Sequence, residues 1–409
     1  MAKTPLNLLV IIALAILSCS CKKGANTNSK VGETIDLSSS LESYEVLPLS
    51  SIASEIDYVI LENSPEAYFR GETSNSYDKL YKIYDNIILI SDGEKLVSFD
   101  LTGRFLRQYG ARGRGPGEFI DISDFTVNPE TREVLILSAG LRKVFIYDFE
   151  GRHIRNIDID FDPFSIRILG NKLFFSTPNR MRASASNHVI VITDFNGKRM
   201  NELLNRPEPN EIVGYGNKAF FGAQVSTIIK NRYYFWANIY DTIYSFNENF
   251  EGITLFPINL GKDRIPQDYL TTDKYSSLSL SELSKYIQNQ NLLITDKYYF
   301  FDVFNKGRLA RIVVFRDSLK SYNLHYIEDS TNKVRKAFQN DLDNLMHFWP
   351  LGTLSSNMLV GFVHGATLRP YLEKENQNIK DETSAGKLKK HLSDPLFDES
   401  VIMIMVTLK

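Results

Sequence analysis

Residues 95–128 read KLVSFDLTGRFLRQYGARGRGPGEFIDISDFTVN, and this stretch decides the fold. It begins as an alternating apolar and polar run up to Asp100, turns through Leu101-Thr102-Gly103, and returns as a second run. In such a turn the Asp side chain caps backbone N–H groups, and a left-handed Gly lets the next strand return antiparallel. The stretch therefore predicts a β-hairpin followed by a loop rich in Gly and Arg.

The hairpin recurs downstream with changed side chains. Copies stand at residues 145–151 (FIYDFEG) and 191–197 (VITDFNG), and a degraded copy stands at residues 243–249 (IYSFNEN). The Asp residues of successive copies are about 45–50 residues apart, a spacing that fits one four-stranded propeller blade. Further apolar runs lie in each interval and continue to the end of the chain, so the pattern predicts six blades.

Ring closure is predicted from two runs that lack partners. The sixth set of strands (352–355, 358–363 and 401–408) has no outer strand, while the early run IDYVIL at residues 56–61 has no blade. Pairing them would remove free sheet edges, which otherwise promote aggregation. We therefore expect an all-β fold, a six-bladed β-propeller closed by pairing of its N- and C-terminal strands.

Two short helical insertions are expected on this ring. Residues 281–290 carry apolar side chains at helical spacing, and residues 330–346 show a clearer amphipathic pattern with good N-cap residues at its start. Residues 373–394 are charged and poor in apolar residues, which is typical of a mobile excursion within the last blade.

Composition narrows the class of protein. Of the 409 residues, 43% are hydrophobic and 23% are charged, and the formal net charge is −2. This composition is that of a globular protein with a large core, and its charge gives no support for nucleic-acid binding.

The N-terminus reads as a targeting segment. Lys3 precedes the apolar run 6–17, and Ser18, Cys19, Ser20 and Cys21 follow. The order Ile16-Leu17-Ser18-Cys19 is that of a bacterial lipobox with Cys19 as the lipidated residue. Cys21 is an alternative, and a plain signal peptide with incidental cysteines is another. We expect a lipoprotein signal peptide at 1–18, a flexible tether at 19–34 and the propeller at 35–409. In such lipoproteins, surface export is associated with acidic residues just after the cysteine. Lys22 and Lys23 do not match that pattern, so we expect a periplasm-facing anchor.

A family resemblance rests on two sets of residues. The stretch from Tyr109 to Phe119, followed by Ile122-Ser123-Asp124-Phe125, resembles the signature of the six-bladed β-propeller lipoproteins of Bacteroidetes, whose blades are similar to NHL repeats. Residues 56–62 and 401–409 resemble that family's opening and closing strands. The resemblance implies a propeller fold and an envelope location, and it implies no activity.

The candidate binding residues are Arg112, Arg114, Glu118 and Asp124, in and just after the Gly-rich loop. Glycines let backbone N–H groups approach a ligand, and the arginines add positive charge suited to a carboxylate, phosphate or acidic sugar. The alternative is a stiff crossover between blades one and two, in which the arginines pair with Glu118 and Asp121. A Gly-rich loop with no following helix is a weak phosphate signal.

Other polar residues are interpreted as structural. Asp158, Asp160 and Asp162 alternate along one strand face, which favours a solvated outer strand over a calcium site. His364 is more simply a turn or core residue than a channel ligand, and aromatic residues such as Trp236 and Trp349 mostly fill the space between blades. The six histidines show no metal-ligand spacing and no nucleophile elbow is present, so neither a metal nor another cofactor is expected.

The function that these observations favour is a lipid-anchored binding or scaffolding module of the cell envelope. Its partner would be an envelope protein, peptide or glycan, and its membrane contact would be the N-terminal lipid alone. The alternative is an envelope lyase or hydrolase acting on glycans or peptides, with its site at the mouth of the propeller channel.

Overall fold

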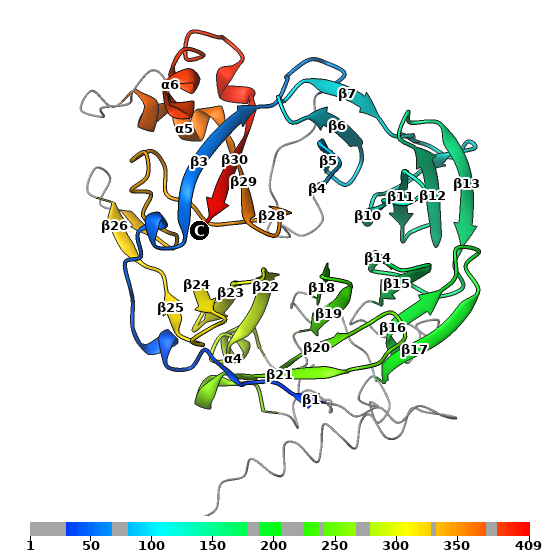
Figure 1. Cartoon of the computed structure of the whole chain (residues 1–409), viewed down its shortest axis with the longest axis horizontal. Coiled ribbons are helices and arrows are strands. Elements are labelled where there is room, and N and C mark those ends of the chain that lie inside the picture. The colour runs from blue at the N-terminus through cyan, green and yellow to red at the C-terminus, as the bar shows by residue number, and fades with distance from the viewer. Residues whose placement is uncertain are drawn as a thin grey trace, which may run out of the picture.

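Six small sheets stand around a central opening, each forming one blade of a propeller (Figure 1). The computed structural model describes residues 30–67, 81–177, 188–205, 224–237, 241–266, 279–328, 333–373 and 383–409. Within a blade, neighbouring strands are antiparallel, and in blades 1 to 5 they follow one another outward from the central opening in chain order. The fold predicted from the repeats is thus confirmed.

The strand bounds, from inner to outer strand, follow the chain. Blade 1 is β4 (Tyr81–Tyr84), β5 (Ile87–Ser91), β6 (Leu96–Asp100) and β7 (Phe105–Gln108); blade 2 is β10 (Asp124–Asn128), β11 (Glu133–Ser138), β12 (Lys143–Asp148) and β13 (His153–Asp158); blade 3 is β14 (Ser165–Leu169), β15 (Lys172–Ser176), β16 (His188–Thr193) and β17 (Arg199–Asn205). Blade 4 is β18 (Gln224–Ile229), β19 (Arg232–Ala237), β20 (Thr242–Phe246) and β21 (Thr254–Asn259); blade 5 is β22 (Gln288–Ile294), β23 (Tyr298–Asn305), β24 (Arg308–Phe315) and β25 (Ser321–Asn323); blade 6 is β28 (Gly352–Ser355), β29 (Met358–His364), β30 (Val401–Leu408) and β3 (Ala53–Ile60).

Short elements lie outside the blade pattern. They are β1 (Lys30–Val31), β2 (Ile35–Asp36), β8 (Ala111–Arg112), β9 (Glu118–Phe119), β26 (Tyr326–Glu328) and β27 (Lys333–Arg335), the helices α4 (Leu280–Leu283), α5 (Gly365–Leu372) and α6 (Ser384–Lys389), and four single turns of 3-10 helix (Ser40–Glu42, Leu49–Ser51, Gly261–Asp263 and Phe397–Glu399). None of the helices in the described part of the chain is long and apolar enough to cross a membrane.

The hydrophobic core lies between the blades. Among the described residues it divides into six clusters, and each cluster joins two neighbouring blades around the ring. Both faces of a blade are therefore covered, which explains why middle strands such as β5 (IILIS) and β11 (EVLILS) are nearly continuous apolar runs.

Ring closure follows the predicted pairing. β3 is the outer strand of blade 6 and pairs antiparallel with β30, with Tyr58 opposite Ile404 and Ile60 opposite Ile402. Ahead of β3, β1 and β2 pair in parallel with β21 of blade 4. The N-terminal segment thus runs along the outside of the ring from blade 4 to blade 6 (Figure 1).

The repeated turn has the predicted geometry. Asp100 Oδ1 accepts hydrogen bonds from the N–H groups of Thr102 (2.9 Å) and Arg104 (3.0 Å). Asp148 and Asp194 cap their turns in the same way. Gly103 has a φ of +88° and lies so close to the preceding outer strand that an added Cβ would be 2.1 Å from the Ile60 oxygen. In the degraded copy, Asn247 replaces the Asp and Phe250 adopts the left-handed φ of +64°.

The predicted helix at 330–346 is wrong for its described part, 333–346. Lys333–Arg335 form strand β27, Asn344 has a left-handed φ of +58°, and Phe338 pairs with Phe348 in an isolated bridge. Phe338 and Leu345 are buried between blades 5 and 6, so packing against two sheets overrides the local helical periodicity. Residues 330–332 lie outside the described residues.

The other insertions also differ from expectation. In the stretch 281–290, helix is confined to the single turn α4, because strand β22 begins at Gln288 and pairs with β23. The larger helices, α5 and α6, lie between β29 and β30, and α6 falls inside the stretch expected to be a mobile excursion. Ala385 and Leu388 of α6 are buried in the core cluster of blades 5 and 6, which holds this segment in place.

Candidate functional site

The Gly- and Arg-rich loop closes on itself between blades 1 and 2. β8 and β9 pair in parallel, with Ala111 opposite Glu118 and Arg112 opposite Phe119. The Glu118 carboxylate accepts a hydrogen bond of 2.7 Å from the Gly115 N–H, and the Gly113 N–H donates to the Phe119 oxygen at 2.9 Å. The loop therefore satisfies some of the hydrogen-bonding groups of its own backbone and holds a defined shape.

The loop packs against the outer two strands of blade 2. The Tyr147 hydroxyl of β12 donates to the Gly117 oxygen, and Gly117, with a φ of +74°, lies against the His153 ring of β13. An added Cβ at Gly117 would be 2.7 Å from that ring, so glycine is required here. Burial, with a smaller effect of the Glu118 charge, raises the pKa of the Tyr147 hydroxyl, which remains a donor.

The two arginines of the loop differ in their contacts. Arg112 pairs with Glu94 of the β5–β6 turn at 2.8 Å, and both side chains are at least half exposed. Arg114 is exposed and forms no ion pair with a described residue. The carboxylate of Asp121 accepts from Ser123, Ser138 and the Gly140 N–H. Among the described residues, Arg114 is thus the arginine of the loop that has no ion-pair partner.

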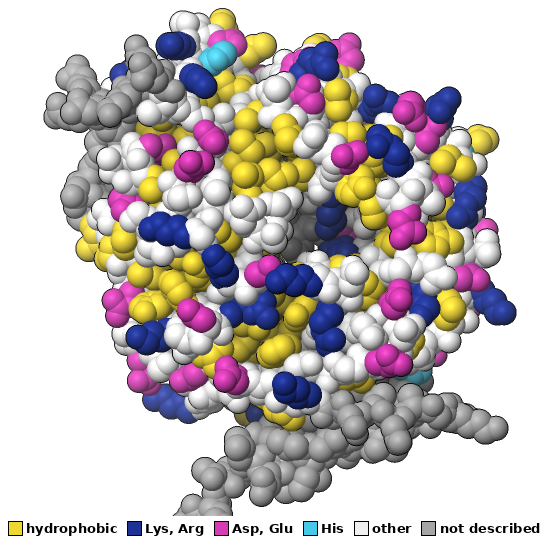
Figure 2. All heavy atoms as spheres, in the orientation of Figure 1, with side chains coloured by type: hydrophobic (Ala, Val, Ile, Leu, Met, Phe, Trp, Pro, Cys, Tyr) yellow, Lys and Arg dark blue, Asp and Glu magenta, His cyan; other side chains and the backbone are white. Residues whose placement is uncertain are grey.

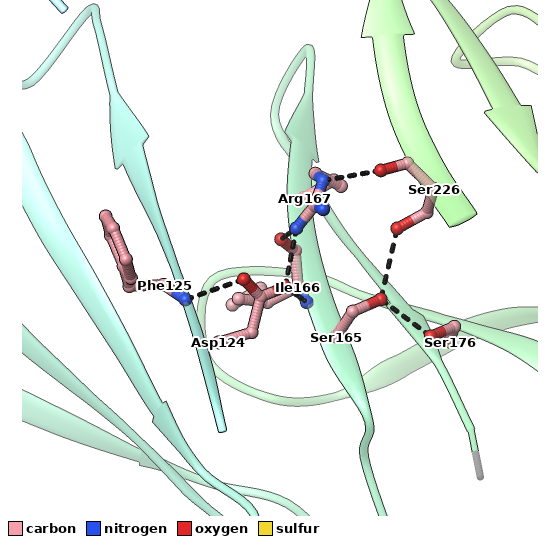
Figure 3. A network of polar contacts seen from close by, with 7 residues as sticks. All are labelled: Asp124, Phe125, Ser165, Ile166, Arg167, Ser176 and Ser226. Atoms are coloured by element: carbon pink, nitrogen blue, oxygen red, sulfur yellow. Dashed lines mark hydrogen bonds and ion pairs between the residues drawn. The ribbon is translucent and has the colours of Figure 1, made fainter. Parts of the chain in front are cut away.

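Asp124 lies apart from the loop, at the start of the inner strand β10. It has no exposed surface, and its carboxylate accepts from the N–H groups of Phe125 and Ile166, both at 2.9 Å. Its Oδ2 also receives the Arg167 guanidinium at 2.5 Å (Figure 3). Arg167 is only 8% exposed, so this is a buried ion pair between the inner strands of blades 2 and 3.

The ion pair continues into blade 4. Arg167 Nε donates to the Ser226 oxygen of β18 at 2.8 Å, and the Ser165 hydroxyl bonds those of Ser176 (2.6 Å) and Ser226 (3.1 Å) (Figure 3). A chain of polar contacts therefore connects the inner strands of three successive blades. Each charged group has a counter-charge and further hydrogen bonds, which is the condition for burying it.

Sequence reasoning located Asp124 but not its partners. For Arg167, one feature of the sequence could have indicated a buried partner: it is a cation inside the otherwise apolar run SIRIL of an inner strand. For Ser226 the sequence offers no such feature, because serine is common in strands. The structure brings Arg112, Arg114 and Glu118 together in one loop, and it places Asp124 in a separate, buried network.

The remaining candidates have structural roles. Asp158, Asp160 and Asp162 each have a different basic partner, namely Lys143 (2.8 Å), Arg199 (2.9 Å) and Arg142 (2.7 Å). Trp236 and Trp349 are buried between blades, as expected. His364 is half-buried just before α5. Within the described ranges, no group of three or more His, Cys, Asp or Glu side chains is arranged to hold a metal ion.

The face seen in Figure 2 is hollowed at its centre, and Lys and Arg side chains lie on the wall of the opening and beside it. Taken together, the closed ring, the inter-blade core and the polar network of the inner strands define a six-bladed β-propeller.

The chain belongs to the family described as "Domain of unknown function (DUF4934)", whose model matches residues 32–405. Its fold is similar to that of a Bacteroides fragilis NCTC 9343 protein classed as exported, with a TM-score of 0.67, 17% identity, and coverage of 93% of this chain and 100% of the other. A DUF4221 protein of Bacteroides vulgatus ATCC 8482 has a TM-score of 0.48 and 9% identity, covering 87% and 97% of the two chains. The comparison with curated proteins returned no match.

Proposed function

We propose that the protein is a lipid-anchored propeller of the bacterial cell envelope that serves as a binding or scaffolding module. The observation that carries the proposal is a ring closed by its own terminal strands, in which a buried network of one ion pair and several hydrogen bonds connects the inner strands of three blades. Such a ring is a rigid support for loops, and binding residues are commonly placed on loops of a rigid scaffold. The exported class of a structural neighbour supports an envelope location.

The proposed anchor is Cys19. Eleven Cα–Cα steps separate Cys19 from Lys30, which pairs with blade 4, so an extended tether would span at most about 40 Å. The propeller would therefore stay close to the membrane that holds the lipid. Lys22 and Lys23 support a periplasm-facing orientation.

The anchor is tested by metabolic labelling with a fatty-acid analogue and by membrane fractionation. We expect Cys19→Ala to abolish labelling and to release the protein into the soluble fraction, whereas the matched control Cys21→Ala keeps both properties. Labelling that survives Cys19→Ala would assign the lipid to Cys21. If the double variant Cys19→Ala/Cys21→Ala stayed in the membrane fraction, the assignment of a lipobox would be wrong.

Arg114 is the residue we propose to face the ligand, with Arg112 and Glu118 of the same loop supporting the surface around it. Its guanidinium has no ion pair with a described residue and stands on a loop of defined shape, which suits it to a carboxylate or phosphate. Polygalacturonate serves as the acidic-sugar probe in isothermal titration calorimetry. We expect Arg114→Ala to abolish its heat of binding, while Arg104→Ala, at an exposed arginine already paired with Asp100, leaves it unchanged. Equal effects of the two variants would reduce the binding to general charge attraction.

A further inference from the structure

Exposed apolar side chains gather at one place on the circumference. Among the described residues, eight large apolar side chains are exposed, and half of them lie here: Tyr44 (55%), Val46 (53%), Ile327 (56%) and Val334 (50%). The other four are distributed over β1, β13, β17 and the segment before β30. Single exposed apolar residues are ordinary, whereas a contiguous group marks a contact surface.

The backbone arrangement explains why these four side chains share a face. The segment around Glu45 runs parallel to Leu324, and Ile327 of β26 lies opposite Val334 of β27. Side chains alternate along such strands. Tyr326 and Arg335 accordingly contact His347 and Tyr371 in the body of the protein.

The outward positions therefore form one surface, which we call the rim face: Tyr44, Val46, His325, Ile327, Val334 and Lys336. It lies beside β26 at the edge of the ring, next to the N-terminal segment (Figure 1).

The rim face carries positive charge that the described residues do not neutralise. Lys336 Nζ lies 3.4 Å from His325 Nδ1 and 4.4 Å from the centre of the Tyr44 ring, and it pairs with no described carboxylate. Burial, together with the nearby charge of Arg308, lowers the pKa of Lys336. Arg308 is exposed and has no ion pair with a described residue either. A carboxylate placed here would relieve this repulsion.

A strand edge borders the same face. In the described part of the chain, β27 pairs with β26 on one side and with no strand on the other. An extended peptide can bind at such an edge by adding a strand.

We propose that the rim face is the docking site for an extended, acidic segment of a partner protein. The segment runs alongside β27, lays apolar side chains on Ile327, Val334 and Tyr44, and places a carboxylate beside Lys336 and Arg308. Its backbone supplies affinity, and the apolar and acidic side chains supply specificity. This site is independent of the proposed ligand surface at Arg114.

The test uses the full mature chain and a fluorescein-labelled peptide of sequence EVEIEV, measured by fluorescence anisotropy. We expect saturable binding with a Kd on the order of 100 µM. Ile327→Ser and Val334→Ser should each weaken it roughly tenfold, and Lys336→Met should weaken it and reduce its salt dependence. Ile154→Ser, at an exposed isoleucine on β13, is the matched control and should have no effect.

Any of the following results would overturn the proposal. One is the absence of binding, or equal binding of the basic peptide KVKIKV. Another is equal weakening by Ile154→Ser. The last is self-association, seen by light scattering, or binding to phosphatidylglycerol vesicles that depends on the same rim-face residues, since either would assign the face to a second copy or to lipid.

Discussion

At the scale of the residue, Asp124 shows how one side chain can hold several blades. It accepts two backbone N–H groups and pairs with Arg167, which in turn reaches Ser226. Burying a charge costs desolvation energy. Removing one member of the pair therefore destabilises the fold strongly, because the other charge stays buried without a counter-charge.

Asp124→Ala should lower the free energy of unfolding by about 3–5 kcal/mol, because it leaves the Arg167 charge buried without a counter-charge. The double variant Asp124→Ala/Arg167→Met should be more stable than the single variant. Asp158→Ala is the control, since Asp158 is 81% exposed in its pair with Lys143 and should cost less than about 1 kcal/mol. Urea unfolding measures all three, and equal losses for Asp124→Ala and Asp158→Ala would contradict the assignment.

Tyr233 makes stability depend on alkaline pH. It is fully buried between blades 3 and 4, and burial raises its pKa to about 12 from the ordinary value of 10.0. Because the folded-state pKa is the higher one, the folded protein holds this proton more tightly. The stabilisation is complete below pH 10 and is lost as pH rises from about 10 to 12.

Tyr233→Phe should therefore flatten the fall in stability above pH 10. The gap between wild type and variant should change by up to about 1.4 kcal/mol per pH unit in that window and stay constant below it. Urea midpoints at pH 8 and at pH 10.8 measure the change. The exposed Tyr44→Phe serves as the control, and a slope identical to that of wild type in Tyr233→Phe would refute the expectation.

At the scale of the element, the N-terminal segment joins blades that are distant in sequence. β1 and β2 extend blade 4 in parallel, and Ile35 and Leu37 are fully buried in the core cluster of blades 4 and 5. This segment therefore contributes to core packing.

Leu37→Ala should cost about 2–5 kcal/mol of unfolding free energy, through lost burial and the cavity it leaves. Val31→Ala, at an exposed position on β1, should cost less than about 0.5 kcal/mol. Thermal unfolding followed by circular dichroism compares the two variants. A small effect of Leu37→Ala would mean that the segment is not part of the cooperative unit.

The repeated turn and the failed helix show what local sequence can predict. The turn at Asp100 was predictable because its cap and its left-handed Gly103 lie within four residues of each other. The conformation of the stretch 333–346 was not predictable, because Phe338 and Leu345 pack against two neighbouring sheets and do not form one face of a helix. The contacts of Asp124 with Arg167, and of Arg167 with Ser226, were hidden for the same reason, since these two residues lie on strands about 40 and 100 residues further along the chain.

At the scale of the whole molecule, the ring is closed by β3 against β30. Without β3, blade 6 would present the edge of the apolar strand VIMIMVTL to solvent. Such an edge is a template for pairing between molecules.

A chain that begins at residue 62 should aggregate, whereas a chain that begins at residue 30 should stay soluble. Size-exclusion chromatography with light scattering distinguishes the two. A monodisperse chain lacking residues 30–61 would contradict the role of β3 in closure.

The sequence alone determined the repeat, its turns, the number of blades and the pairing of the terminal strands, because each of these follows from local patterns and their spacing. The tertiary structure alone decided that Asp124 binds Arg167, that the stretch 333–346 is extended, and that Lys336 joins four exposed apolar side chains on one rim face. These features depend on which distant strands become neighbours once the ring closes, and local sequence patterns do not specify those neighbours.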